Sequence, residues 1–205
     1  MYMSKIFKIL SLVLVLAIIS LNVKAITVND HRIAVLVNDK LITSYDIVQR
    51  MKLRALLNGI DITPENNNQL ANVAVDELIK EVLKNEKLQE YSISIDEDEY
   101  LQHEKSFYDN ISLSEENLRE LFKTNNIKYS EFRNYLIYEM SWQKLVSGIY
   151  YRLTSASEIE IEEIILKNPE ITIDVAKNII IQKQLDLKSS KMIRDLFNEA
   201  TIEYK

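Results

Sequence analysis

The sequence is most informative in the residue types that it has little of. Its 205 residues include two glycines, two prolines, two histidines and no cysteine. An average soluble domain holds about 7% glycine and 5% proline, so a chain this poor in both uses few tight turns and favours long helices. Without cysteine there are no disulfides, no thiol nucleophile and no thiolate metal site.

Nucleotide and imidazole chemistry are also excluded. Phosphate-binding loops need two or three glycines within a few residues, whereas Gly59 and Gly148 lie far apart in the sequence. His31 and His103 have no serine, aspartate or second histidine at a catalytic or metal-binding spacing. The sequence therefore predicts no cofactor, no metal and no catalytic set.

Two acidic clusters are interpreted as helix surface. The run 96–99 has no glycine at the bend that a calcium loop requires, and acids in the first turn of a helix favour its dipole. Glu158, Glu160, Glu162 and Glu163 alternate with isoleucines and are interpreted as the solvated side of a short helix. A catalytic carboxylate pair is the alternative for this second cluster.

Residues 1–25 have the pattern of a secretory signal peptide. Lys5 and Lys8 precede an uncharged run over 9–21, and Val23 and Ala25 place small residues at the two positions that signal peptidase reads. Retention of the segment as a membrane anchor is the alternative, because its length approaches that of a bilayer span. We predict cleavage after Ala25 and export to the periplasm of a Gram-negative bacterium, a compartment that a cysteine-free chain fits because stray thiols are oxidised there.

The charge balance restricts the partners. Cleavage removes three lysines and no acid, which leaves 22 basic and 31 acidic residues and a formal net charge of −9. Nucleic acid is therefore excluded as a partner. Hydrophobic residues make up 47% of the chain and charged residues 27%, as in a folded protein. Residues 26–205 have the length of one domain.

Beyond residue 30 the pattern predicts a short hairpin followed by helices. Apolar runs over 33–37 and 41–43 flank the turn residues Asn38 and Asp39. Capping residues and apolar periodicity then place the helices. Two helices are expected over 44–57, after Thr43, and from Thr63-Pro64 to Tyr91. Three more begin at Ser94, Ser112 and Ser157, and a long one spans 131–153 after Ser130. The last helix spans 174–199 and has an apolar stripe from Val175 and Ile179 to Phe197.

The helix predicted over 131–153 has apolar residues on both sides. Most of them cover one half of its circumference, but Ile137, Met140 and Tyr151 lie on the other half. Such a helix packs on two sides or presents an apolar surface to a ligand. Gly148 within it indicates a close helix contact or a bend.

The segment from Arg32 to Ile47 resembles the opening of the periplasmic chaperone SurA family, with an apolar strand, a Val-Asn turn, a second strand and a Ser-Asp helix start. The similarity continues along the chain in the same order and spacing. The matching positions are Val37-Asn38, Ile42-Thr43-Ser44, Asp46, 75–80, 93–96, 129–136, Glu139-Met140 and 200–204.

The resemblance implies a mainly α fold, a SurA/trigger-factor-like peptide-binding core of about six to seven helices with a small β-sheet. In the family the C-terminal strand returns to pair near the first one, which here implies a sheet of 33–43 with 201–204. Residues 26–168 would be the N-terminal part of a single domain 26–205, and residues 169–205 its closing helix and strand.

One departure from the family pattern bears on activity. Family members usually carry one or two parvulin-type prolyl isomerase domains between these parts, but here only residues 167–176 separate the last two helices. A domain of roughly 100 residues does not fit there, and the glycine-rich strands and histidines of a parvulin site are missing. We therefore predict that the protein is not an enzyme.

The sequence thus predicts an ATP-independent holdase chaperone that binds unfolded outer-membrane or secreted proteins through an apolar groove. A membrane-anchored or dedicated structural partner protein of the envelope is the alternative, and a prolyl isomerase comes third. The resemblance and the helix pattern leave a homodimer open. The residues expected to line the client groove are Ile137, Met140, Tyr151, Tyr138 and Trp142.

Overall fold

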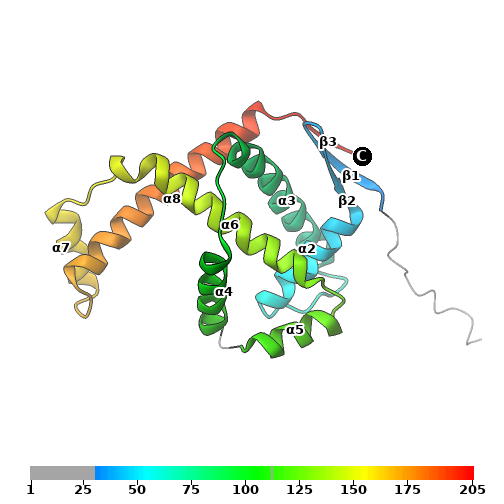
Figure 1. Cartoon of the computed structure of the whole chain (residues 1–205), viewed down its shortest axis with the longest axis horizontal. Coiled ribbons are helices and arrows are strands. Elements are labelled where there is room, and N and C mark those ends of the chain that lie inside the picture. Colours follow the sequence, from blue (N-terminus) through cyan, green and yellow to red (C-terminus); the bar gives the residue numbers. More distant parts are fainter. Residues whose placement is uncertain (1–30, 112) are drawn as a thin grey trace, which may run out of the picture. The chain divides into compact units, whose positions relative to one another are not determined.

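The computed structural model describes residues 31–111 and 113–205, so the predicted signal peptide, its cleavage after Ala25 and the predicted cap at Ser112 lie outside the described residues. His31–Lys205 is one compact unit (Figure 1). Its elements are β1 (Ile33–Val37), β2 (Lys40–Thr43), α2 (Ser44–Leu57), α3 (Asn67–Glu90), α4 (Glu97–Ile111), α5 (Glu115–Thr124), α6 (Tyr129–Tyr150), the 3-10 turn η1 (Tyr151–Leu153), α7 (Glu158–Lys167), α8 (Ile173–Glu199) and β3 (Ile202–Tyr204).

The three strands form one antiparallel sheet in the order β2-β1-β3. The hairpin of β1 and β2 turns at Asn38, and β3 returns from the C-terminus to pair Ile202 with Val37 and Tyr204 with Val35. The mainly α fold and the sheet of an N-terminal hairpin with the C-terminal strand are thus confirmed.

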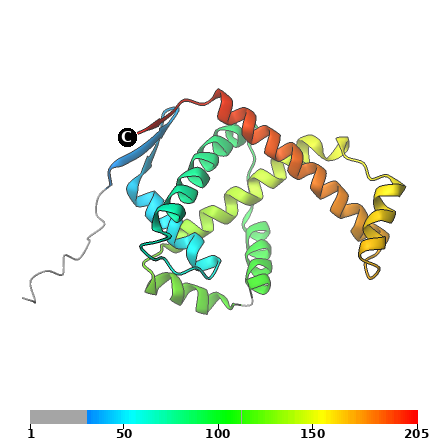
Figure 2. The same ribbon diagram turned by 180° about the vertical axis from the view of Figure 1, so that it is seen from behind.

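Helix α3 is the central element of this unit. It contacts both strands of the hairpin, and it also packs against α2, α6 and α8 (Figures 1 and 2). Between the sheet and α3 lies a cluster of fully buried aliphatic side chains. Its members are Val35, Val37, Ile42, Ile79 and Leu83.

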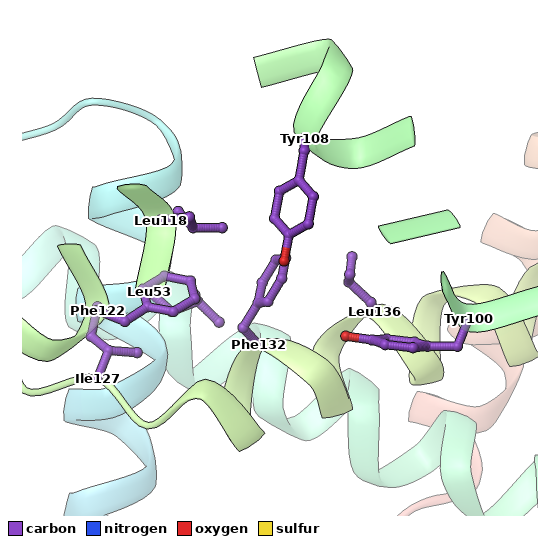
Figure 3. Close-up of a cluster of buried hydrophobic side chains, with 8 residues drawn as sticks. All are labelled: Leu53, Tyr100, Tyr108, Leu118, Phe122, Ile127, Phe132 and Leu136. Carbon is purple, nitrogen blue, oxygen red and sulfur yellow. The ribbon is translucent and has the colours of Figure 1, made fainter. Parts of the chain in front are cut away.

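Two further buried clusters join helices of this unit to α6. One joins α2, α4, α5 and α6 around Phe132, which is completely buried and packs at a tilt against neighbouring aromatic rings (Figure 3). The other joins the end of α3 to α6 and α8, with Trp142 of α6 facing Ile181 and Leu185 of α8. Helix α8 therefore contributes to the core along its middle part.

Helix starts follow the sequence where a reciprocal capping pair is present. The Thr43 side chain accepts from the Asp46 amide while the Asp46 carboxylate accepts from the Thr43 amide, and α2 begins as predicted. Ser157 and Glu160 form the same box at the start of α7. These two predicted starts are confirmed.

The predicted start of α4 was wrong by two residues. The Asp96 carboxylate accepts from the Glu99 amide and the Glu99 carboxylate accepts from the Asp96 amide, so Asp96 caps α4 instead of Ser94. The predicted start of α5 was also two residues too early, because Ser114 caps this helix and its hydroxyl accepts from the Asn117 amide. An acidic or hydroxyl residue directly before the helix outcompetes one that lies further away.

Helices α3 and α6 also begin or end away from their predicted positions. Asn66 accepts from the Thr63 amide and donates to the Asp61 carbonyl, which holds 64–66 in a turn and delays α3 to Asn67. Helix α6 begins at Tyr129 after Lys128, without a side-chain cap, and ends at Tyr150. No heavy atom lies within 4 Å of a Cβ placed on Gly148, so the close helix contact, one of the two alternatives for this glycine, is wrong.

Helices α7 and α8 are joined by residues 168–172 alone. The short connection that the sequence predicted is therefore present, and no further domain is inserted between these two helices. Among the described residues, no helix has the length and hydropathy needed to cross a bilayer.

Candidate functional site

The described residues contain no candidate metal cluster. Within 31–111 and 113–205, no group of three or more His, Cys, Asp or Glu side chains could hold a metal ion. The His31 ring packs 5.0 Å from the ring of Tyr45, and His103 is half-buried on α4. Neither histidine belongs to a candidate metal cluster within the described residues.

The acidic run at the start of α4 has a structural role. The Glu97 carboxylate accepts from the Arg133 guanidinium at 2.6 Å, and the Glu99 carboxylate accepts from the Lys144 ammonium at 2.8 Å. Both cations come from α6, and their hydrogen bonds lower the pKa of each carboxyl. The run ties α4 to α6, and its first-turn position agrees with the helix-dipole interpretation.

The fold distributes the five predicted groove residues over several surroundings. Ile137 and Met140 are half-buried against the aromatic cluster around Phe132. Tyr138 borders a cavity of about 230 Å³ between α3 and α6, and burial raises the pKa of its phenol. These three side chains contribute to packing along α6.

Trp142 and Tyr151 lie in opposite environments. The Trp142 side chain is 3% exposed, and its indole Nε1 donates to the Ser189 hydroxyl on α8. Tyr151 lies in η1 and is 56% exposed. The structure therefore does not bring the five residues together on one surface.

A charged cleft lies between α2, α3 and α6. Two adjoining cavities of about 210 and 230 Å³ share Arg50, Glu77 and Tyr135 in their linings. Arg50 pairs with Glu81 and lies over the Tyr135 ring, 5.5 Å from its centroid, while Arg54 pairs with Glu77. Burial raises the pKa of the Glu77 carboxyl against the lowering effect of Arg54 and Arg50. The cations and anions of this cleft already neutralise one another.

Exposed apolar side chains gather on a different part of the molecule. We call residues 151–187, which comprise η1, α7 and the first half of α8, the arm. Eight large apolar side chains on the arm are 44% to 80% exposed, and α7 has no buried residue. These side chains are Tyr151, Leu153, Ile159, Leu166, Ile173, Val175, Ile179 and Leu187.

Helix α7 packs against α8 through one face only. Ile161, Ile164 and Ile165 are half-buried on that face, whereas Ile159 and Leu166 are 71% and 80% exposed on the other. Figures 1 and 2 show α7 lying beside the N-terminal part of α8, at the opposite end of α8 from the sheet. The outer face of α7 thus has no partner within the described residues.

Polar contacts fix the start of the arm. The side-chain amide of Gln184 on α8 donates to the Ser155 carbonyl at 2.7 Å and accepts from the Ser155 amide at 3.1 Å. The capping box of Ser157 and Glu160 begins α7 two residues later. The exposed apolar residues of α7 are therefore presented by an ordered helix.

A second, smaller apolar surface lies between α2 and α5. Ile60, Ile62 and Leu121 are 42%, 40% and 38% exposed around a cavity of about 490 Å³. Their exposed fractions are lower than those on α7. This surface is the natural comparison for the arm.

Of the exposed apolar residues on the arm, only Tyr151 is predicted from the sequence as a groove residue. Periodicity assigned Val175 and Ile179 to a core-facing stripe, yet they are 44% and 45% exposed. The available signal was α7 itself, whose isoleucines and leucine occur all around the helix. A short helix that is apolar all round is either buried in a core or exposes apolar surface, and α7 has no core around it.

The fold and the surface together define a mainly helical protein with a small antiparallel sheet and with exposed apolar side chains on the arm. The chain belongs to the SurA-like N-terminal domain family, whose sequence model matches residues 2–146.

Two individual proteins are similar to the chain. An uncharacterized protein of Rickettsia bellii (strain RML369-C) is 27% identical over 167 residues, which cover 81% of this chain and 55% of the relative. The chain therefore spans about half the length of that relative.

A solved structure from Campylobacter jejuni is also similar. It belongs to a pair described as SurA-like chaperones, the virulence factor PEB4 and the periplasmic protein Cj1289. The two chains are 22% identical, the match covers 67% of this chain and 50% of the Campylobacter chain, and the TM-score is 0.38.

Proposed function

We propose that this protein is an ATP-independent holdase chaperone of the periplasm, which binds unfolded outer-membrane or secreted polypeptides on the apolar surface of the arm. The observation that carries the proposal is the concentration of exposed apolar side chains on residues 151–187. Soluble proteins rarely leave such a surface open unless it binds another molecule. Membership of the SurA-like family supports the same function.

The physical basis of binding is the burial of client side chains on the arm. Each apolar Å² removed from water contributes about 25 cal/mol, and this contribution is not directional. A surface of aliphatic side chains can therefore accept many different sequences. Of the predicted groove residues, Tyr151 lies on this surface, while the other four lie along α6 among core and cleft residues.

Aggregation of an unfolded outer-membrane porin tests the proposal. The porin aggregates when it is diluted from urea, and the aggregates scatter light. An equimolar amount of this protein should suppress the scattering. The double variant Ile159→Ser with Leu166→Ser should lose most of the suppression. Both positions are exposed on α7, so the free energy of unfolding should change by less than about 0.5 kcal/mol.

The matched control changes the second apolar surface. The double variant Ile60→Ser with Ile62→Ser replaces two isoleucines that are also exposed and that lie outside the arm. It should suppress aggregation as well as the natural protein does. Equal losses in the two variants would remove the arm from the proposal, and no suppression by the natural protein would refute the holdase function.

The location is tested separately by N-terminal sequencing of the protein from the cell envelope. Ile26 as the first residue would support export with removal of residues 1–25. Met1 as the first residue would favour the alternative, an anchored partner protein of the envelope.

A further inference from the structure

The outer face of α7 combines two apolar side chains with two free carboxylates. Helical spacings of three and four place Ile159, Glu162, Glu163 and Leu166 along one face. All four side chains are exposed. Among residues 31–111 and 113–205, neither Glu162 nor Glu163 belongs to an ion pair. Glu162 and Glu163 therefore place two negative charges between the apolar side chains of Ile159 and Leu166.

The charge of the whole arm has the same sign. Residues 151–187 contain seven acidic and four basic side chains. A ligand that covers Ile159 and Leu166 also removes water from Glu162 and Glu163. If the ligand atoms there were apolar, the two carboxylates would lose their hydration and gain no ion pair in return. A lysine or arginine of the ligand would instead pair with them and pack its aliphatic stem on Ile159 and Leu166.

The same charges disfavour the other occupants of an exposed apolar face. A second copy that docked symmetrically through α7 would bring Glu162 and Glu163 close to their own counterparts. Anionic lipid surfaces and nucleic acids carry the wrong sign as well. The complementary partner is a cationic and apolar polypeptide.

From this complementarity we infer that the outer face of α7 binds extended segments of unfolded polypeptides in which lysine or arginine lies next to aliphatic or aromatic residues. The inference rests on the proposed chaperone function and names the class of client segment that the arm prefers.

Fluorescence anisotropy with two labelled peptides tests the preference. Both peptides are short, unstructured and identical in their aliphatic and aromatic residues, and they differ only in carrying lysines or glutamates between them. Exposed ion pairs contribute modestly, so the lysine peptide should bind about fivefold more tightly at low salt. The difference should vanish near 1 M salt, where charges are screened beyond about 3 Å.

Variants assign the preference to α7. Glu162→Gln with Glu163→Gln removes the charge with little change in shape and should abolish the difference between the peptides. The matched control, Glu116→Gln with Glu120→Gln, neutralises two exposed glutamates on α5 and should leave the difference intact. Ile159→Ser with Leu166→Ser should weaken binding of both peptides.

Equal affinities for the two peptides, or tighter binding of the glutamate peptide, would overturn the inference. If the protein still suppressed porin aggregation, the proposed chaperone function would be unaffected by that result. Failure to bind either peptide, together with no suppression, would refute the function and the inference with it. Sedimentation velocity gives the remaining outcome. A dimer that dissociates in the Ile159→Ser, Leu166→Ser variant would show that a second copy occupies the face, which also overturns the inference.

Discussion

The indole Nε1 of Trp142 on α6 donates a hydrogen bond of 2.8 Å to the hydroxyl of Ser189 on α8. Trp142 is 3% exposed in the cluster that joins α6 to α8. This contact lies at the base of the arm, between the last core helix and the helix that extends into the arm. The contact is one of those that attach α8, and with it the arm, to α6.

Ser189→Ala should destabilise the protein by about 1–2 kcal/mol, because it leaves a buried indole N–H without an acceptor. Trp142 is the only tryptophan in the chain, so its fluorescence during urea unfolding reports this junction directly. Ser190→Ala is the matched control, since Ser190 is the exposed neighbour on the same helix. Equal unfolding midpoints for the two variants would contradict the role given to Ser189.

The Glu104 carboxylate is buried among tyrosines that hold α4 against α6. Tyr100 donates to it at 2.5 Å, Tyr129 also donates to it, and the hydroxyls of Tyr108 and Tyr129 lie 3.0 Å apart (Figure 3 shows Tyr100 and Tyr108). Burial, and then hydrogen bonding within the network, raises the pKa of Tyr100 and of Tyr108 above the ordinary value. The folded state therefore holds these protons at a pH where the unfolded chain releases them.

This network predicts a loss of stability at high pH. The unfolded tyrosines titrate near pH 10, so above that pH the folded state binds more protons than the unfolded state, and the free energy of unfolding decreases. Urea midpoints measured from neutral pH upward should fall beyond about pH 10. Tyr108→Phe removes one titrating group and should make this fall less steep. Identical slopes for the variant and the natural protein would refute the assignment.

The ion pair of Arg50 and Glu81 links α2 to α3 with the Arg50 side chain only 8% exposed. Glu81→Gln should destabilise the protein by about 2–4 kcal/mol, because it leaves a buried guanidinium without its counter-charge. Replacing both residues, as Arg50→Met with Glu81→Leu, should cost less than Glu81→Gln alone. The measurement is the urea unfolding midpoint of each variant.

The control for this prediction is an exposed pair on α3. Asp76 and Lys80 are four residues apart, with side chains 53% and 41% exposed. Asp76→Asn should cost less than about 1 kcal/mol. Costs of similar size for Asp76→Asn and Glu81→Gln would show that burial of Arg50 contributes nothing.

Sequence predicted the elements well wherever the signal is local. The reciprocal capping pairs at Thr43 and Ser157 identified the starts of α2 and α7, since both halves of each pair lie within four residues. At the start of α4 the cap is Asp96 and not Ser94, and apolar periodicity does not encode the backbone geometry that distinguishes the two residues. Caps with several candidates within a few residues are therefore ambiguous in one sequence.

The candidate site was much harder to predict, because exposure is a property of the tertiary fold. Val175 and Ile179 have the spacing of a core stripe, and the same stripe is indeed buried one to two turns later, at Ile181 and Leu185. The first part of α8 packs against α7 and buries Ala176 and Ile180 instead, which leaves Val175 and Ile179 exposed. No local pattern marks the residue at which a helix leaves its core.

Asn38 joins the hairpin to the C-terminal strand. Its amide donates to the Thr201 carbonyl at 2.8 Å, its side-chain oxygen accepts from the Thr201 amide at 3.0 Å, and its side-chain amide donates to Glu86 at 2.8 Å. Its φ of 52° lies in the left-handed region, which asparagine tolerates better than most residues. One residue therefore supplies both the turn and the attachment of β3.

Two substitutions separate these roles. Asn38→Ala loses the side-chain hydrogen bonds and strains the backbone, and it should destabilise the protein by about 2–3 kcal/mol. Asn38→Gly loses the same bonds without the strain and should cost about 1 kcal/mol. Both should speed hydrogen exchange at the Thr201 amide, whereas Asp39→Ala, which changes an exposed side chain, should not. If alanine and glycine cost the same, the left-handed backbone at Asn38 contributes no strain, and the hydrogen bonds to Thr201 and Glu86 account for the whole effect.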